Sequence, residues 1–179
     1  MIKFIDSLLV VNYPTISKDD LAWIQNIRQE YDELNFRAID PHFTLVFPLI
    51  DIDRATLISH IQQSIKDVQA FEFTLRCAIL SNDAFSDYTH VFLVPDEGYS
   101  KIVKLHDRLY TAVLVDRLRL DIPFIPHIGI ANSLNAQSCK ELVDRLNSQQ
   151  FEISGRIERL DLIWSEGDLV ETIESTNLV

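Results

Sequence analysis

Hydrophobic residues along the chain follow two periods, one near four residues and one of two, which are typical of helices and strands respectively. The helical period appears in four segments. The first follows Ser17, which with Asp20 three residues later resembles a capping box, and the second starts at about Asp53. The apolar positions of the four segments are, in order, Leu21, Ile24, Ile27, Tyr31 and Leu34; Leu57, Ile61, Ile65 and Val68; Ile102, Leu105, Leu109 and Val113; and Cys139, Leu142, Val143 and Leu146. The pattern predicts an α+β fold.

The segments between these helices have the apolar pattern of strands, and the polar loop SNDAFSDY separates two of them. The four glycines and six prolines are spread through the chain, and no Gly/Ser-rich linker divides it. We therefore expect a single bilobal domain over residues 1–179. The expected strands are 7–13, 42–49, 71–80, 90–95, 124–132 and 151–164.

An internal repeat organises these elements. PHFTL at 41–45 is echoed by PHIGI at 126–130, and FEFTLR at 71–76 is echoed by FEISGR at 151–156. The histidine and the following Phe-Glu pair are 29 positions apart in the first copy and 24 in the second, with one helical pattern in each interval. The repeat predicts a duplicated strand-helix-strand unit that forms two pseudo-symmetric lobes.

The two copies place a histidine on the same side of each strand. Because side chains alternate along a strand, His42 and Thr44 share one face with Val46 and Pro48, and the bulky apolar residues at 43, 45, 47 and 49 form the core face. In the second copy His127 lies on the same side as Gly129. A two-fold relation between the lobes would make the two histidines neighbours.

Two imidazoles on either side of one phosphorus suit the cleavage of a phosphodiester. One neutral ring can take a proton from the attacking water or hydroxyl, and the other, protonated, can give a proton to the leaving oxygen. The hydroxyl of Thr44 would donate to a nonbridging oxygen as charge develops there. A single H-x-T triplet is weak evidence, and a structural role for each histidine is the alternative, but duplication of the motif favours function.

These motifs resemble those of the 2H phosphoesterase superfamily, in particular its group of 2'-5' RNA ligase-like proteins and 2',3'-cyclic phosphodiesterases. The resemblance spans nearly the whole chain. It implies antiparallel sheets around a central cleft that holds both motifs, with His42 and His127 as catalytic residues and Thr44 as a phosphate-binding residue. It also implies a small nucleotide or RNA-terminal phosphodiester as substrate, cleaved without a metal ion or other cofactor.

The second motif departs from the family pattern at Gly129, where the family has threonine or serine. The loss of one donor from a developing charge costs on the order of 2.7 to 4 kcal/mol when nothing replaces it. The backbone N–H of Gly129 can approach a phosphate closely, and Ser133 is a substitute if the strand continues on the same face. The alternative is a nucleotide or RNA-end binding protein with weak or lost catalysis.

Further candidates for contact with the substrate are Arg76, Arg156 and Phe124. The two arginines occupy equivalent points of the repeat and are predicted either to touch a phosphate or to be exposed strand residues. Phe124, just before the second motif, either forms a wall for a base or packs in the core.

The other three histidines are not expected in the site. His60 and His106 fall within helical patterns beside charged or polar neighbours, which predicts partly exposed helix residues. His90 opens a strand, and we expect it to lie outside the cleft. The sequence contains no G-x-S-x-G and no Gly-rich phosphate loop.

The composition restricts the class of ligand and the cellular compartment that we expect. With 16 Lys and Arg against 27 Asp and Glu, the formal net charge is −11, which disfavours binding to a long nucleic acid duplex and leaves a short or terminal phosphate ligand. No apolar run is long enough to span a membrane, and the start resembles no signal peptide, so we expect a cytoplasmic monomer. Cys77 and Cys139 are expected to stay reduced, and no spacing suggests a metal site.

Overall fold

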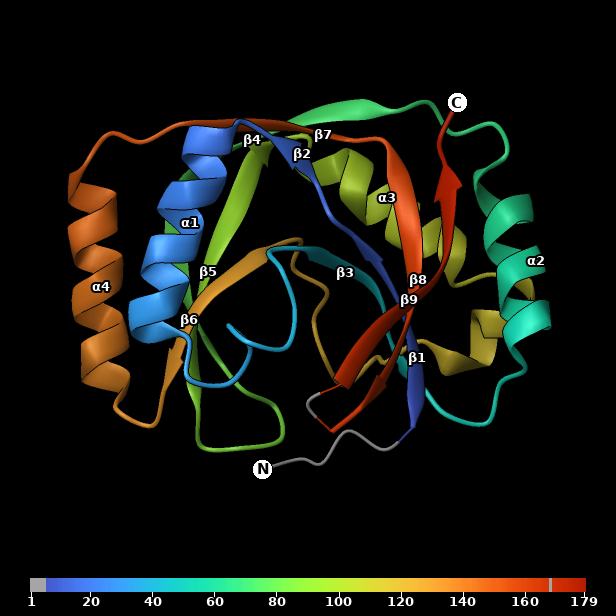
Figure 1. The fold of residues 1–179 in the computed structure, drawn as a ribbon, viewed down its shortest axis with the longest axis horizontal. Coiled ribbons are helices and arrows are strands. Elements are labelled where there is room, and N and C mark those ends of the chain that lie inside the picture. Colours follow the sequence, from blue (N-terminus) through green and yellow to red (C-terminus); the bar gives the residue numbers. More distant parts are fainter. Residues whose placement is uncertain (1–5, 168) are drawn as a thin grey trace.

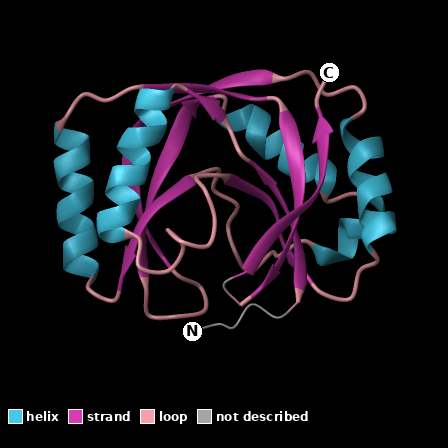
Figure 2. Ribbon diagram, viewed as in Figure 1, coloured by secondary structure: helices cyan, strands magenta, loops and turns pink. Residues whose placement is uncertain are grey.

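The structure, a computed structural model, describes residues 6–167 and 169–179. It contains two antiparallel sheets with helices on their outer faces (Figures 1 and 2). The first sheet has the order β3-β1-β8-β9 and the second the order β2-β7-β4-β5-β6. The strands are β1 (Ser7–Asn12), β2 (Thr15–Ile16), β3 (Phe43–Leu49), β4 (Phe71–Asn82), β5 (Thr89–Glu97), β6 (Ile128–Ser133), β7 (Ile153–Ile157), β8 (Arg159–Glu166) and β9 (Leu169–Asn177).

Four α-helices and one 3-10 helix cover the sheets. Helices α1 and α4 lie against the second sheet, and α2 and α3 lie against the first (Figure 1). No helix in the described part of the chain is both long and apolar enough to cross a membrane. The helices are α1 (Lys18–Tyr31), α2 (Arg54–Ile65), α3 (Tyr99–Leu109), the 3-10 helix η1 (Ala112–Arg117) and α4 (Ala136–Ser148).

Two of the helix boundaries show how the sequence sets them. The predicted cap at Ser17 is confirmed, since its hydroxyl accepts from the backbone N–H of Asp20 at 3.1 Å. The third helix is shorter than its apolar pattern predicts and ends at Leu109. Ala112 has a φ of +46°, which an α-helix does not accommodate, so Val113 falls in η1 and is exposed.

The repeat is visible as a local two-fold axis. Strands β4 and β7, which carry the FEFTLR and FEISGR copies, pair antiparallel, and Thr74 lies directly opposite Ser154. These two residues hold the same position in the two copies, and their hydroxyl oxygens are 3.4 Å apart. The axis therefore passes between them. The predicted α+β fold with duplicated units and antiparallel sheets is confirmed.

Each half of the chain contributes strands to both sheets. The first half supplies β1 and β3 to the first sheet and β2 and β4 to the second. The second half supplies β5, β6 and β7 to the second sheet and β8 and β9 to the first. An edge-to-face contact between Phe43 and Phe73, with ring centroids 5.0 Å apart, joins the two sheets in the core. Both halves of the chain therefore build each sheet.

The strict alternation predicted for 42–49 fails in its second half. Phe43 and Leu45 are buried as expected, but Val46 is also fully buried, and Phe47 is only half-buried. The register between β1 and β3 shifts on both sides of Val10, which breaks the alternation at this point. The prediction for His42 and Thr44 does not depend on the shifted part.

Candidate active site

The two motif histidines occupy equivalent positions, each immediately before its strand. The Nδ1 atom of His42 lies 2.8 Å from the carbonyl oxygen of Asp40, and that of His127 lies 2.6 Å from the carbonyl oxygen of Ile125. Because a carbonyl oxygen only accepts, Nδ1 donates in both rings. In a neutral ring this leaves Nε2 of each histidine as a base. The same backbone contact, two residues upstream, thus fixes both rings.

The surroundings of the two rings lower the pKa of each. Burial lowers the pKa of His42, and the charge of Arg28 lowers it further. The carboxylates of Asp32 and Asp40 oppose this shift. Burial also lowers the pKa of His127, to about 4, and the charges of His42 and His90 add to this effect. His42 is therefore close enough to His127 for its charge to act on that ring.

The residues two positions after each histidine differ in what they offer. Thr44 is half-buried and lies opposite Val11 of β1, on the face that carries His42. Gly129 is exposed and lies opposite Phe92 of β5. A Cβ atom added at Gly129 would meet no other atom within 4 Å. The second motif thus has open space where the first has a hydroxyl.

A β-bulge removes Ser133 from the face of Gly129. Strand β6 pairs Gly129 with Phe92 but Ala131 with Val91, so one extra residue is inserted between them. After the bulge the faces are exchanged, and Ser133 lies opposite Thr89, which is buried. Its hydroxyl accepts from the backbone N–H of Asn135, at the start of α4. The expectation that Ser133 follows Gly129 on one face is wrong, and we leave Ser133 out of the site.

An aromatic stack that the sequence pattern did not predict lies against His127. Phe92 stacks on His127, with ring centroids 3.6 Å apart and planes 15° apart, and His90 lies 5.7 Å from Phe92 on its own strand. Nε2 of His90 lies 2.9 Å from a carboxylate oxygen of Asp83. His90 therefore lies near His127, contrary to expectation. Its position two residues before Phe92, on the same strand face, is the signal that could have found it.

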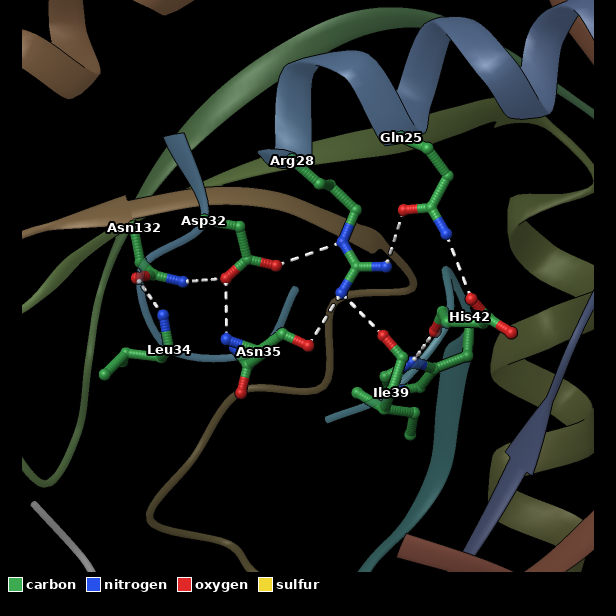
Figure 3. A network of polar contacts seen from close by, with 9 residues as sticks. Gln25, Arg28, Asp32, Leu34, Asn35, Ile39, His42 and Asn132 are labelled. Atoms are coloured by element: carbon green, nitrogen blue, oxygen red, sulfur yellow. Dashed lines mark hydrogen bonds and ion pairs between the residues drawn. The ribbon is translucent and has the colours of Figure 1, made fainter. Parts of the chain in front are cut away.

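A buried polar network joins the two motif strands (Figure 3). Asn132 of β6 donates to Asp32 at 2.5 Å, and the other carboxylate oxygen of Asp32 accepts from Arg28 at 3.0 Å. Arg28, which is 2% exposed, also donates to the carbonyl oxygens of Asn35 and Ile39 at 3.1 and 2.6 Å. The loop that leads to the first motif is therefore folded around one buried arginine.

The network reaches the histidine itself through Gln25. Its amide oxygen accepts from Arg28 at 3.2 Å, and its amide nitrogen donates to the carboxylate of Asp40 at 3.0 Å. The carbonyl of the same Asp40 accepts from His42. Figure 3 shows this continuous path from Asn132 on one motif strand to His42 before the other. The network therefore links the two strands through hydrogen bonds that are buried at Asp32 and exposed at Asp40.

Two helix histidines are buried rather than partly exposed, and one of them fixes Phe124. His106 is 2% exposed, its Nδ1 lies 2.8 Å from the carbonyl oxygen of Leu45, and its ring stacks on Phe124 with centroids 3.6 Å apart. His60 bonds the carbonyl of Leu109 through Nε2 at 2.7 Å. One face of Phe124 is therefore covered by His106, and its packing matches the core alternative.

The two repeat arginines are engaged by carboxylates. Arg76 bonds Asp96, Glu97 and Glu152 at 2.7 to 2.9 Å. Arg156 pairs with Glu158 at 3.1 Å on a side chain that is 46% exposed. Among the described residues neither arginine makes a hydrogen bond or ring contact with a motif histidine, so we do not include either in the proposed site. Among residues 6–167 and 169–179, no three His, Cys, Asp or Glu side chains come together in a way that could hold a metal ion.

The model of the 2'-5' RNA ligase superfamily matches residues 16–169 of this chain. The chain belongs to this superfamily. Two bacterial proteins named "Putative phosphoesterase" are similar along most of their length. The protein of Bacillus licheniformis is 24% identical over 157 residues, which cover 87% of this chain and 88% of that protein. The protein of Geobacillus sp. is 23% identical over 167 residues, which cover 93% of this chain and 92% of that protein. The resemblance to 2H phosphoesterases drawn from the motifs is confirmed.

Solved structures of low sequence identity share the fold. TT0787 of Thermus thermophilus superposes with a TM-score of 0.63 at 14% identity, over 96% of this chain and 97% of that chain. E. coli LigT complexed with phosphate superposes with a TM-score of 0.60 at 14% identity, over 97% and 98%. At this level of identity the likeness shows the fold alone.

Proposed function

We propose that this member of the 2'-5' RNA ligase superfamily is a metal-independent phosphodiesterase that opens the 2',3'-cyclic phosphate of a nucleotide or RNA end. The observation that carries the proposal is the pair of equivalent histidines, each held through Nδ1 by a backbone carbonyl and each with Nε2 available. A structural relative supports the small ligand, since E. coli LigT has been crystallised with phosphate and with 3'-AMP.

In the proposed reaction a water oxygen attacks the phosphorus of the cyclic ester. His127 takes the proton of that water on Nε2, the P–O bond to one ribose oxygen breaks, and protonated His42 gives its proton to that oxygen. The product is a phosphate monoester, and the proton gained by one histidine equals the proton lost by the other. Thr44 donates to a nonbridging oxygen as the charge on the phosphate grows.

The electrostatic surroundings support this assignment of acid and base. Burial lowers the pKa of His42, but the nearby carboxylates of Asp32 and Asp40 oppose this shift, and a bound anionic phosphate would favour the protonated ring further. At His127 burial lowers the pKa to about 4, the charges of His42 and His90 add to this shift, and no carboxylate of the described residues opposes it. A neutral ring is the form that accepts a proton.

The test is incubation of the protein with nucleoside 2',3'-cyclic monophosphates and detection of the monophosphate product. We expect turnover in the presence of EDTA, and its loss in both His42→Ala and His127→Ala. Arg156→Gln, an exposed substitution outside the proposed site, should retain the activity of the unsubstituted protein and serves as the control. Turnover that EDTA abolishes, or that survives removal of either histidine, would refute the mechanism.

A second function is favoured by the open space at Gly129. Without a second hydroxyl the site keeps the means to bind a phosphate and loses a donor to the transition state. This predicts a nucleotide or RNA-end binding protein with little turnover. Saturable binding of 3'-AMP without any product from cyclic nucleotides would support it over the enzyme.

A further inference from the structure

Two rows of side chains run across the strands of the first sheet, one through Thr44 and the other through His42. The register of the sheet aligns Thr44 of β3 with Val11 of β1, and Val11 with Asp161 of β8. Continuation of both registers by two residues aligns His42 with Tyr13 and Tyr13 with Arg159. The ring of Tyr13 lies edge-on to that of His42, with centroids 6.1 Å apart, in agreement with this row.

This face of the sheet is not the face that packs in the core. Val10 and Leu162, which alternate with the residues of the two rows, belong to the hydrophobic core cluster. Val11 and Ile163 are buried but lie outside that cluster, on the opposite face. His42, Tyr13 and Arg159 therefore share the non-core face of the sheet.

Arg159 is held at one nitrogen and open at the other two. Its Nε donates to Asp161 at 3.1 Å, and Asp161, which is 1% exposed, also accepts from the hydroxyl of Ser175 at 2.5 Å. The arginine side chain itself is 49% exposed. No side chain or carbonyl of the described residues accepts a hydrogen bond from its Nη1 or Nη2. The buried carboxylate thus orients a guanidinium whose terminal N–H groups point away from it.

A guanidinium fixed at Nε and open at its Nη atoms is suited to bidentate contact with a phosphate. Neighbouring strands are about 4.8 Å apart, so the backbones of His42 and Arg159 are about 10 Å apart, with Tyr13 between them. Burial and the charges of Asp161 and Asp40 raise the pKa of the Tyr13 phenol to about 12. The charge of Arg159 also acts on Tyr13 and opposes this rise. The phenol of Tyr13 therefore stays protonated and can donate to an anion.

We propose that Tyr13 and Arg159 form a second anion subsite, which binds a further phosphate of the substrate next to the one held by His42 and Thr44. This inference rests on the proposed function for the identity of the first phosphate. It names the substrate class more narrowly, as a nucleotide with a phosphate at both the 3' and the 5' side, such as the end of an RNA strand, rather than a nucleoside cyclic monophosphate.

The test compares binding of adenosine 3'-monophosphate and adenosine 3',5'-bisphosphate by isothermal titration calorimetry. A charge-assisted bidentate contact predicts that the bisphosphate binds about tenfold or more tightly. Arg159→Gln should reduce this ratio to near one. Arg156→Gln is the matched control, since that side chain is 46% exposed and also pairs with a carboxylate two residues away at 3.1 Å, and it should leave the ratio unchanged.

Removal of Arg159 alone leaves the buried carboxylate of Asp161 without its cation, so a second variant guards against loss of the fold. Arg159→Gln combined with Asp161→Asn removes both charges, and it should also lose the preference. Equal affinity of the unsubstituted protein for the two ligands, or a preference that persists in the double variant, would overturn the subsite. A preference for the bisphosphate without turnover of any cyclic ester would refute the proposed function and leave the subsite standing.

Discussion

Gly129→Ser is expected to increase the activity of this protein, which is unusual for a substitution in a proposed active site. The new Cβ would meet no atom within 4 Å, so the backbone of β6 need not move. The serine hydroxyl would occupy the position in the second motif that the Thr44 hydroxyl has in the first. The variant therefore restores a donor that the duplicated site lacks.

The size of the effect follows from the value of such a donor. One preorganised donor to a developing oxyanion contributes about 2.7 to 4 kcal/mol, equivalent to a change in kcat of about 100-fold to 1,000-fold. A newly introduced serine is less well oriented, and its ordering costs up to about 1 kcal/mol. We therefore expect kcat for a 2',3'-cyclic nucleotide to rise by about tenfold or more.

The assay is the steady-state rate of cyclic phosphate opening, with thermal unfolding as a check on the fold. Gly155→Ser is the contrasting control, because its Cβ would lie 2.5 Å from a ring atom of Phe73, and it should lower the melting temperature. A rate that falls or stays unchanged in Gly129→Ser, with the fold intact, would refute the argument. It would show that a phosphate does not meet this position, or that the backbone N–H of Gly129 already serves it.

Three further predictions concern the motif threonine, the buried network and the pH dependence of stability. Thr44→Val should lower kcat by about 100-fold or more with little change in melting temperature, measured by the same assay. Arg28→Met leaves Asp32, whose side chain is 3% exposed, as an unpaired buried charge. Urea denaturation should therefore show a loss of about 3 to 5 kcal/mol in the free energy of unfolding, and adding Asp32→Asn should recover part of it. Because the pKa of His127 is lowered from 6.5 to about 4, the folded protein binds fewer protons than the unfolded chain between these values, and stability should rise with pH across this window. His127→Gln should weaken that pH dependence; an unchanged slope would contradict the shift.

The histidine motifs and the α+β fold were predictable because they depend on local pattern and repetition. The periods of the apolar residues identify the helices and strands, and the paired copies at 41–45 and 126–130 reveal a two-fold relation without any knowledge of contacts. The cap at Ser17 follows from two residues three positions apart. These features are encoded within short stretches of chain.

The errors concern features set by distant contacts. The bulge in β6 changes the face of Ser133, and periodicity predicts a regular strand there. His106 is buried because its ring finds a carbonyl 61 positions away, and the acidic partners that engage Arg76 lie 20 to 76 positions away. The Arg28 network spans up to 100 positions between Asp32 and Asn132. No window of local sequence contains both ends of such contacts.

The most direct test of the central claim, that His42 and His127 bind one common anion, is an NMR titration of the histidine ring resonances with inorganic phosphate and with 3'-AMP. The account predicts that the resonances of both rings shift along one saturation curve with a single Kd, and that replacement of either histidine by alanine weakens the response of the other. Shifts confined to one ring, or two different Kd values, would contradict it.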